Sequence, residues 1–106
     1  MITIDDFRKI ELKVAEIKEV SDHPNADKLY IVTVDLGDKL KQLVAGIKNS
    51  YSKEELIGRQ VVVVDNLEPA MLRGVESQGM ILAASDEAGV FIVSPLKKMK
   101  LGSIVK

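Results

Sequence analysis

Apolar and β-branched residues occur in this chain in short runs separated by Gly, Pro, Asn and Asp, and this spacing predicts strands rather than long helices. The clearest run, Val61 to Val64, is an unbroken series of valines typical of a strand buried on both faces. A second strand is predicted over Leu29 to Leu36, with one apolar face formed by Tyr30, Val32, Val34 and Leu36. Further strands are predicted at residues 39–45, 80–84, 90–93 and 101–105, with a hairpin turn at 85–89.

The stretch from Ile10 to Val20 has an ambiguous period. Leu12 and Val14 alternate as in a strand, but Ala15 and Ile17 shift the apolar face by one residue. A strand with a bulge near Ala15-Glu16 explains the shift, because one extra residue turns the following side chains to the other face. A helix through Ile10, Val14 and Ile17 is the alternative.

Two capping boxes predict two short helices. Thr3 followed by Asp6 starts a helix that runs to about Lys9. Ser52 followed by Glu55 starts a second helix of under two turns, and Gly58 lies where a helix C-terminus favours glycine.

The expected fold is all-β: a five-stranded OB-fold barrel with a short N-terminal helix and one short helix between strands 3 and 4. Barrel closure removes the exposed strand edges that would otherwise promote aggregation. The 106 residues suffice for one domain, and we expect it to span residues 1–106.

Composition excludes several classes of site. The chain has no cysteine and one histidine, which excludes disulfides, thiol catalysis, Cys-based zinc sites and a two-His metal site within one chain. No apolar run approaches the ~20 residues of a membrane span, and the N-terminus lacks signal-peptide features. We therefore expect a soluble cytoplasmic protein with no metal and no cofactor.

Catalysis by this chain alone is not expected. His23 lies in a turn beside Pro24, where we expect it to be exposed to solvent. The adjacent pairs Asp5-Asp6 and Glu54-Glu55 do not face one another on a helix, so neither forms an acid–base pair. A metal or acid–base enzyme remains only as a rival hypothesis, and turnover without an added partner would support it.

The charges nearly balance, with 15 basic and 16 acidic residues, but the basic groups cluster. Residues 39–53 contain four lysines and no acid, and residues 97–106 contain four more. The two segments either form one basic patch or are separate solvated loops, and charge alone does not decide between these.

The segment from Asn66 to Met80 interrupts two strong strands with an unusual set of polar groups. Arg73 offers a planar guanidinium suited to phosphate, and Ser77 and Gln78 offer donors and acceptors. Met80 is soft enough to lie against a base or sugar. The alternative is a loop followed by a strand, with Met71 and Met80 in the core.

The chain carries several motifs in a fixed order: DHPNADKL at 22–29, VDLG at 34–37, VAGI at 44–47, EELIG at 54–58, NLEP at 66–69 and LRGVESQGMILAA at 72–84. Together they resemble the tRNA-binding domain family, over about Asp6 to Val105. The family includes the C-terminal domain of methionyl-tRNA synthetase, its free-standing β-subunit form and related tRNA-binding proteins. Running from Met1 to Lys106, the chain resembles the stand-alone form or an excised C-terminal domain.

The resemblance implies an OB-fold that binds folded tRNA by shape with little sequence preference, commonly as a homodimer. It also implies a partner, the methionyl-tRNA synthetase catalytic chain, whose aminoacylation the domain would aid in trans. The chain has only four aromatic residues, and Tyr30 is expected to point inward. Shape and backbone contacts therefore fit better than stacking of several bases.

On this reading the tRNA-binding residues form two rims and a face. Asn25 and Lys28 form one rim, Lys48 and Lys53 form another, and the face is lined by Arg73, Ser77, Gln78 and Met80. Lys39, Lys41 and Lys97–Lys98 are expected to flank this face.

For dimerisation we expect the N-terminal helix and the segment Leu101 to Val105 to matter. The alternative function is a small dimeric chaperone or secretion factor of the same fold that binds extended peptides, with less dependence on salt.

Overall fold

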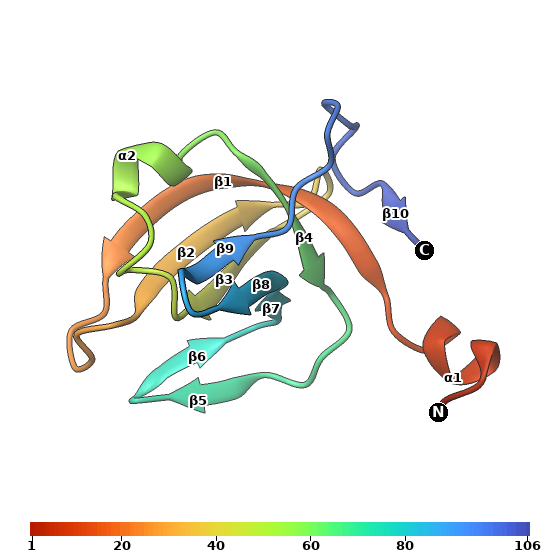
Figure 1. Ribbon diagram of the computed structural model, residues 1–106, viewed down its shortest axis with the longest axis horizontal. Helices are drawn as coiled ribbons and strands as arrows, with labels where there is room; N and C mark the ends of the chain where they lie inside the picture. Colours follow the sequence, from red (N-terminus) through yellow and green to blue (C-terminus); the bar gives the residue numbers. More distant parts are fainter.

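A curved antiparallel sheet forms the body of the molecule, and the computed structural model describes all of residues 1–106 (Figure 1). The strand order is β3-β2-β1-β4-β7, and β10 also pairs with β1. The long first strand pairs with β2 along one half and with β4 along the other. The strands of this sheet are β1 (Leu12–Asp22), β2 (Tyr30–Asp35), β3 (Leu40–Ala45), β4 (Gln60–Val64), β7 (Met80–Ile81) and β10 (Ile104–Val105).

The predicted bulge in β1 exists, but it lies further along the strand. Ile17 pairs with Val34 and Glu19 pairs with Thr33, so Lys18 is the extra residue. The bulge was predicted too early in the strand because Val14 is buried, but on the face of β1 that lies outside the core cluster. There its backbone exchanges hydrogen bonds with Gly102 and Ser103 of the C-terminal segment.

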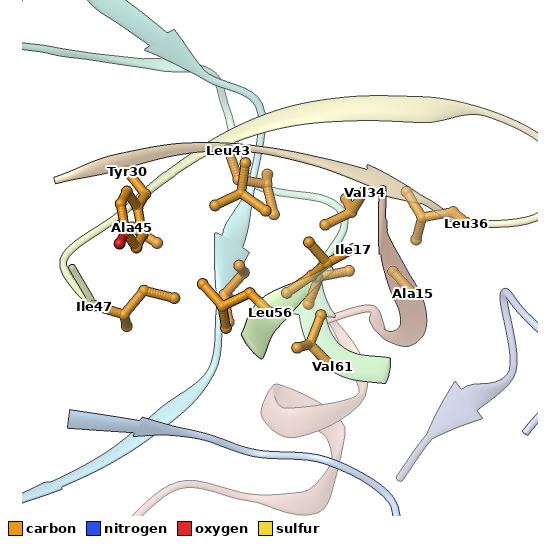
Figure 2. Close-up of a cluster of buried hydrophobic side chains, with 13 residues drawn as sticks. Ala15, Ile17, Tyr30, Val34, Leu36, Leu43, Ala45, Ile47, Leu56 and Val61 are labelled. Atoms are coloured by element: carbon orange, nitrogen blue, oxygen red, sulfur yellow. The ribbon is translucent and has the colours of Figure 1, made fainter. Parts of the chain in front are cut away.

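The core is a single cluster of 13 buried residues enclosed by the sheet (Figure 2). The predicted apolar face of β2 points into it, and β4 is buried on both faces as predicted. Figure 2 shows Ile17, Leu56 and Val61 grouped in this cluster. Leu56 belongs to α2 (Lys53–Leu56), which therefore contributes to the core between β3 and β4.

Side chains complete the barrel where strand pairing stops. The Gln78 backbone N–H donates to the Gln42 carbonyl at 2.8 Å, and the Gln42 N–H donates to Gln78 Oε1 at 2.9 Å. The Val44 N–H donates to Ser77 Oγ at 3.0 Å. Gly79 allows the chain to pass close to β4 at this point, because a Cβ there would lie 2.7 Å from the Val64 carbonyl oxygen. The result is the predicted five-stranded barrel, nearly closed.

Two hairpins extend from the sheet. The predicted one is present as β8 (Ala83–Asp86) and β9 (Gly89–Ile92). The other, β5 (Ala70–Leu72) with β6 (Val75–Ser77), lies in a segment interpreted from the sequence as a loop. Both capping boxes are formed, at α1 (Ile4–Arg8) and at α2. Neither helix is long and apolar enough to cross a membrane.

Candidate nucleic-acid interface

The β1–β2 loop (residues 23–29) and the β5–β6 hairpin lie next to each other at one end of the molecule (Figure 1). The hairpin belongs to the connection between β4 and β7, which are the fourth and fifth strands of the barrel. In OB-folds the loops between strands 1 and 2 and between strands 4 and 5 flank the face that binds oligonucleotides. This end of the barrel is therefore the candidate interface.

His23 links the two loops from a buried position, with only 5% of its surface exposed. Its Nδ1 accepts a hydrogen bond from the Asn25 N–H at 3.0 Å, so the ring proton is assigned to Nε2. Nε2 then donates to the Leu72 carbonyl oxygen, 2.9 Å away on the hairpin. The expectation of a solvent-exposed histidine is wrong, because its partner lies 49 residues away and left no local signal.

Arg73 lies at the tip of the hairpin and contacts the β1–β2 loop. Its Nη2 donates to the Asn25 carbonyl at 3.2 Å, and Asn25 Nδ2 donates to the Arg73 carbonyl at 3.3 Å. Arg73 and Gly74 have φ of 52° and 88°, the left-handed pair of a two-residue type I′ turn. Glycine adopts this conformation freely, whereas an L-residue is strained by roughly 1–2 kcal/mol.

Lys28 and Arg73 line one hollow of about 400 Å³ between the two loops, together with Ala26, Asp27 and Leu29. Neither cation takes part in an ion pair within the chain. The structure therefore brings together Asn25, Lys28 and Arg73, three of the residues predicted to bind tRNA.

Lys48 and Lys53 meet at Asp22, at the end of β1 beside His23. Their Nζ atoms lie 3.1 and 3.0 Å from the two Asp22 carboxylate oxygens. Hydrogen bonds from Lys53 and then from Lys48 lower the pKa of Asp22 below its ordinary value. Two lysines on one carboxylate leave a local excess of one positive charge at this predicted rim.

The other three residues expected on the face are dispersed. Ser77 is buried, and its hydroxyl donates to the Gly79 carbonyl while it accepts from Val44. Gln78 is bonded to Gln42 of β3. Met80 is 46% exposed and Met71 is 65% exposed, so the alternative interpretation with both methionines in the core is wrong.

Lys39 and Lys41 do not lie on this end of the barrel as free cations. Together with Lys13 they surround the buried Asp65, with Nζ to carboxylate distances of 3.1, 2.6 and 2.9 Å respectively. Burial alone would raise the pKa of Asp65, but hydrogen bonds from Lys41, Lys13 and Lys39 outweigh it and hold that pKa well below its usual range. This cluster could not be predicted from local sequence patterns, because its carboxylate follows β4, far along the chain from the lysine-rich segment.

The family comparison decides which class of OB-fold this is. A family model described as "Putative tRNA binding domain" matches residues 12–104. The chain belongs to the tRNA-binding domain family. This confirms the resemblance drawn from the ordered motifs.

Relatives of this tRNA-binding domain include archaeal methionine–tRNA ligases. The chain is 55% identical over 105 residues to the ligase of Thermococcus kodakarensis and 57% identical over 105 residues to that of Pyrococcus abyssi. Each match covers 99% of this chain but 14% of the relative. The domain therefore spans about one seventh of the length of these relatives.

Solved structures show the same fold in free-standing chains. The MetRS-related protein of Pyrococcus horikoshii has a TM-score of 0.92 at 33% identity, over 100% of this chain and 98% of that one. The CsaA chaperone protein of Picrophilus torridus has a TM-score of 0.93 at 35% identity, over 100% of both chains. Both are similar to the tRNA-binding domain along its whole length.

Aromatic side chains contribute little to the interface of this tRNA-binding domain. Tyr30 is buried as predicted, and its hydroxyl donates to the Tyr51 carbonyl at 2.8 Å. Tyr51 packs edge-to-face against Phe91, with ring centroids 6.2 Å apart. Phe7 lies in α1, away from the two loops. Phe91 is the one clearly exposed ring, at 42% exposure, so the interface has no row of rings on which several bases could stack.

Proposed function

We propose that this domain binds folded tRNA through the phosphate backbone, at the end where the β1–β2 loop meets the β5–β6 hairpin. The observation that carries the proposal is the hollow between these loops, which holds two cations, Lys28 and Arg73, and one carboxylate, Asp27, with neither cation in an ion pair. Arginine binds phosphate through two parallel hydrogen bonds, and lysine adds a mobile point charge.

Some of the predicted residues contact the RNA in this proposal, and the others hold the two loops in position. Asn25, Lys28, Lys48, Lys53 and Arg73 contact the RNA. Met80, exposed on β7 and paired with Val64, adds an apolar contact away from these five residues. Ser77 and Gln78 hold the base of the hairpin on β3. His23 fixes the hairpin against the β1–β2 loop.

The proposed setting is methionyl-tRNA synthesis in the cytoplasm. There the domain serves as the C-terminal domain or β-subunit of methionyl-tRNA synthetase and presents tRNA to the catalytic chain, without catalysing a reaction itself. Support comes from identities of 51–57% to ligases over nearly the whole chain, for example in Pyrococcus abyssi and Nanoarchaeum equitans.

A second candidate function is a chaperone that binds extended peptides. It is supported by the TM-score of 0.93 to the CsaA chaperone protein and by the exposed apolar groups Met71, Leu72 and Met80. Peptide binding releases few counterions, so its affinity should change little with salt.

The test is fluorescence anisotropy of labelled folded tRNA at roughly 50 and 200 mM salt, with an unfolded RNA of equal length as control. We expect tight binding of the folded form at low salt and a large loss at high salt. Arg73→Glu should weaken binding by roughly tenfold or more, because it removes a charge-assisted contact and adds repulsion.

Lys9→Glu is the matched control, since it makes the same charge change on an exposed lysine of the α1 end. Thermal unfolding should show that both variants are folded, with Arg73→Glu slightly less stable than wild type because the hydrogen bond to the Asn25 carbonyl is lost. Equal affinity for both RNAs, or an unchanged affinity of Arg73→Glu, would contradict the proposal.

We also propose that the domain forms a homodimer through its two chain ends. Ile4, Phe7 and Ile10 near α1 and Ile104 and Val105 of β10 line one largely apolar hollow of about 370 Å³. Ile104 is 74% exposed and lies in one contiguous apolar patch with exposed Ile4 and Ile10, and such a patch is typical of a protein interface.

Ile104→Glu should therefore give a folded monomer, because the exposed side chain contributes little to the barrel itself. Light scattering after gel filtration measures the mass, and Ile57→Glu serves as a control at another exposed isoleucine. A dimer that survives Ile104→Glu with unchanged mass would argue against this interface.

A further inference from the structure

Basic side chains that make no ion pair gather at a second site on the molecule, apart from the interface described above. Of the 15 basic residues, eight take part in ion pairs. Of the other seven, Lys28 and Arg73 lie between the two loops, and Lys100 and Lys106 belong to the C-terminal segment. The remaining three, Arg59, Lys97 and Lys98, line one hollow together.

This basic hollow has a volume of about 430 Å³ and lies between the start of β4 and the segment that follows β9. In Figure 1 these elements lie near α2, at the other end of the molecule from the β5–β6 hairpin. Of the nine residues that line it, Pro95 and Leu96 carry the apolar side chains. Its one carboxylate, Glu16, is already paired with Lys18 at 2.7 Å. The basic hollow therefore has a net positive charge.

The walls of the basic hollow are held in place by hydrogen bonds. Gln60 Nε2 donates to the Met99 carbonyl at 2.6 Å, and the Met99 N–H donates to Gln60 Oε1 at 2.9 Å. The Ser94 hydroxyl donates to the Gln60 carbonyl. These bonds fix both ends of the segment that carries Lys97 and Lys98.

Arg59 is oriented in the same way. Its Nε donates to the Glu55 carbonyl at 2.7 Å, at the end of α2. The two terminal nitrogens of the guanidinium make no hydrogen bond or ion pair within the chain. Terminal guanidinium nitrogens held in this way suit phosphate oxygens, because little side-chain freedom is lost on binding.

We propose that the basic hollow is a second phosphate-binding site, which holds the RNA backbone independently of the β1–β2 loop and the hairpin. Three cations supplied by two chain segments fit a run of phosphates better than one small anion. An acidic protein segment is less favoured, because Pro95 and Leu96 are the only apolar side chains of the hollow and provide little of the apolar core typical of protein interfaces. The inference rests on the proposed function, since that function brings RNA to the domain.

The test is the salt dependence of tRNA binding by the double variant Lys97→Ala/Lys98→Ala. Each phosphate contact contributes roughly one unit to the slope of log K against log salt concentration. We expect the slope to fall by roughly one to two units and the low-salt affinity to drop by about tenfold or more. Lys9→Ala, which removes an exposed lysine already paired with Asp6, should leave the slope unchanged.

Combining the double variant with Arg73→Glu separates the two sites. If both contact RNA, the losses in log K should add, because the sites share no residue. Titration to saturation identifies the source of the phosphates. If wild type and every variant bind one RNA per domain, one tRNA spans both sites. If wild type binds two RNAs per domain and the variants bind one, the basic hollow holds a second RNA.

Failure of the proposed function and failure of the second site give different results. A wild-type domain that does not bind folded tRNA would overturn the proposed function. A wild-type domain that binds, with Arg73→Glu weakened but Lys97→Ala/Lys98→Ala identical in slope and affinity, would overturn the second site alone.

Discussion

Asp65→Asn is expected to lower the free energy of unfolding by about 2–3 kcal/mol at neutral pH. The Asp65 side chain is only 4% exposed, and its carboxylate is paired with three lysines. Lys13 belongs to β1, Lys41 belongs to β3, and Lys39 directly precedes β3. Asparagine keeps the shape but not the charge, so three lysines would face one another around a neutral amide. The cost stays below that of a fully buried pair because the lysines are partly exposed and can turn toward water.

The same carboxylate gives stability a defined pH dependence. The pKa of Asp65 is lowered in the folded state, so its contribution is complete above the pKa of the unfolded chain, about 4. It is lost as pH falls below that value, toward the lowered pKa of the folded state. The stability curves of wild type and Asp65→Asn should therefore converge in strong acid.

Urea unfolding between neutral pH and about pH 2 measures this difference. Asp22→Asn is the matched control, because Asp22 also accepts from two lysines but is about half exposed, and its loss should change stability much less. A difference between wild type and Asp65→Asn that stays constant down to acid pH would show that the carboxylate charge is not its cause.

The features predicted well from the sequence depend on residues a few positions apart. The capping boxes at Thr3 and Ser52 and the alternating face of β2 need only neighbours within about four residues, and all three are present. Barrel closure was predicted from strand count, but the side chains that achieve it, Ser77 and Gln78, were assigned to the tRNA-binding face. Their partners on β3 are more than 30 residues away.

The features that were missed depend on distant partners or on an unusual residue. His23 was expected in solvent because its partner Leu72 lies on a hairpin not recognised in the sequence. That hairpin was missed because its turn is Arg-Gly, whereas type I′ turns are recognised by Asn-Gly or Asp-Gly. The basic segment of residues 39–53 looked free of acids, yet Asp65 and Asp22 pair with four of its lysines.

Arg73→Asn should stabilise the domain and weaken tRNA binding at the same time. Asparagine tolerates the left-handed conformation that Arg73 adopts at φ of 52°. Relief of this strain, less the lost hydrogen bond to the Asn25 carbonyl, should raise the free energy of unfolding by about 0.5–1 kcal/mol. Asparagine fits the left-handed conformation of this turn with less strain than arginine, so the presence of Arg73 is better explained by a role in binding.

The affinity for folded tRNA should fall by about fivefold to tenfold, less than for Arg73→Glu, because the charge is removed and not reversed. Anisotropy and urea unfolding on one protein preparation measure both effects. Lys28→Gln is the matched control: it removes the neighbouring cation of the same hollow without altering the turn, so it should weaken binding and leave stability unchanged.

The two readouts test separate steps of the argument. If Arg73→Asn binds tRNA as tightly as wild type, Arg73 does not contact RNA and the strained turn has another cause. If the variant is less stable than wild type, the hydrogen bond to Asn25 outweighs the strain, and the conformation of Arg73 no longer argues for a binding role. A gain in stability together with a loss in affinity is the result expected of a residue retained for binding at the expense of the fold.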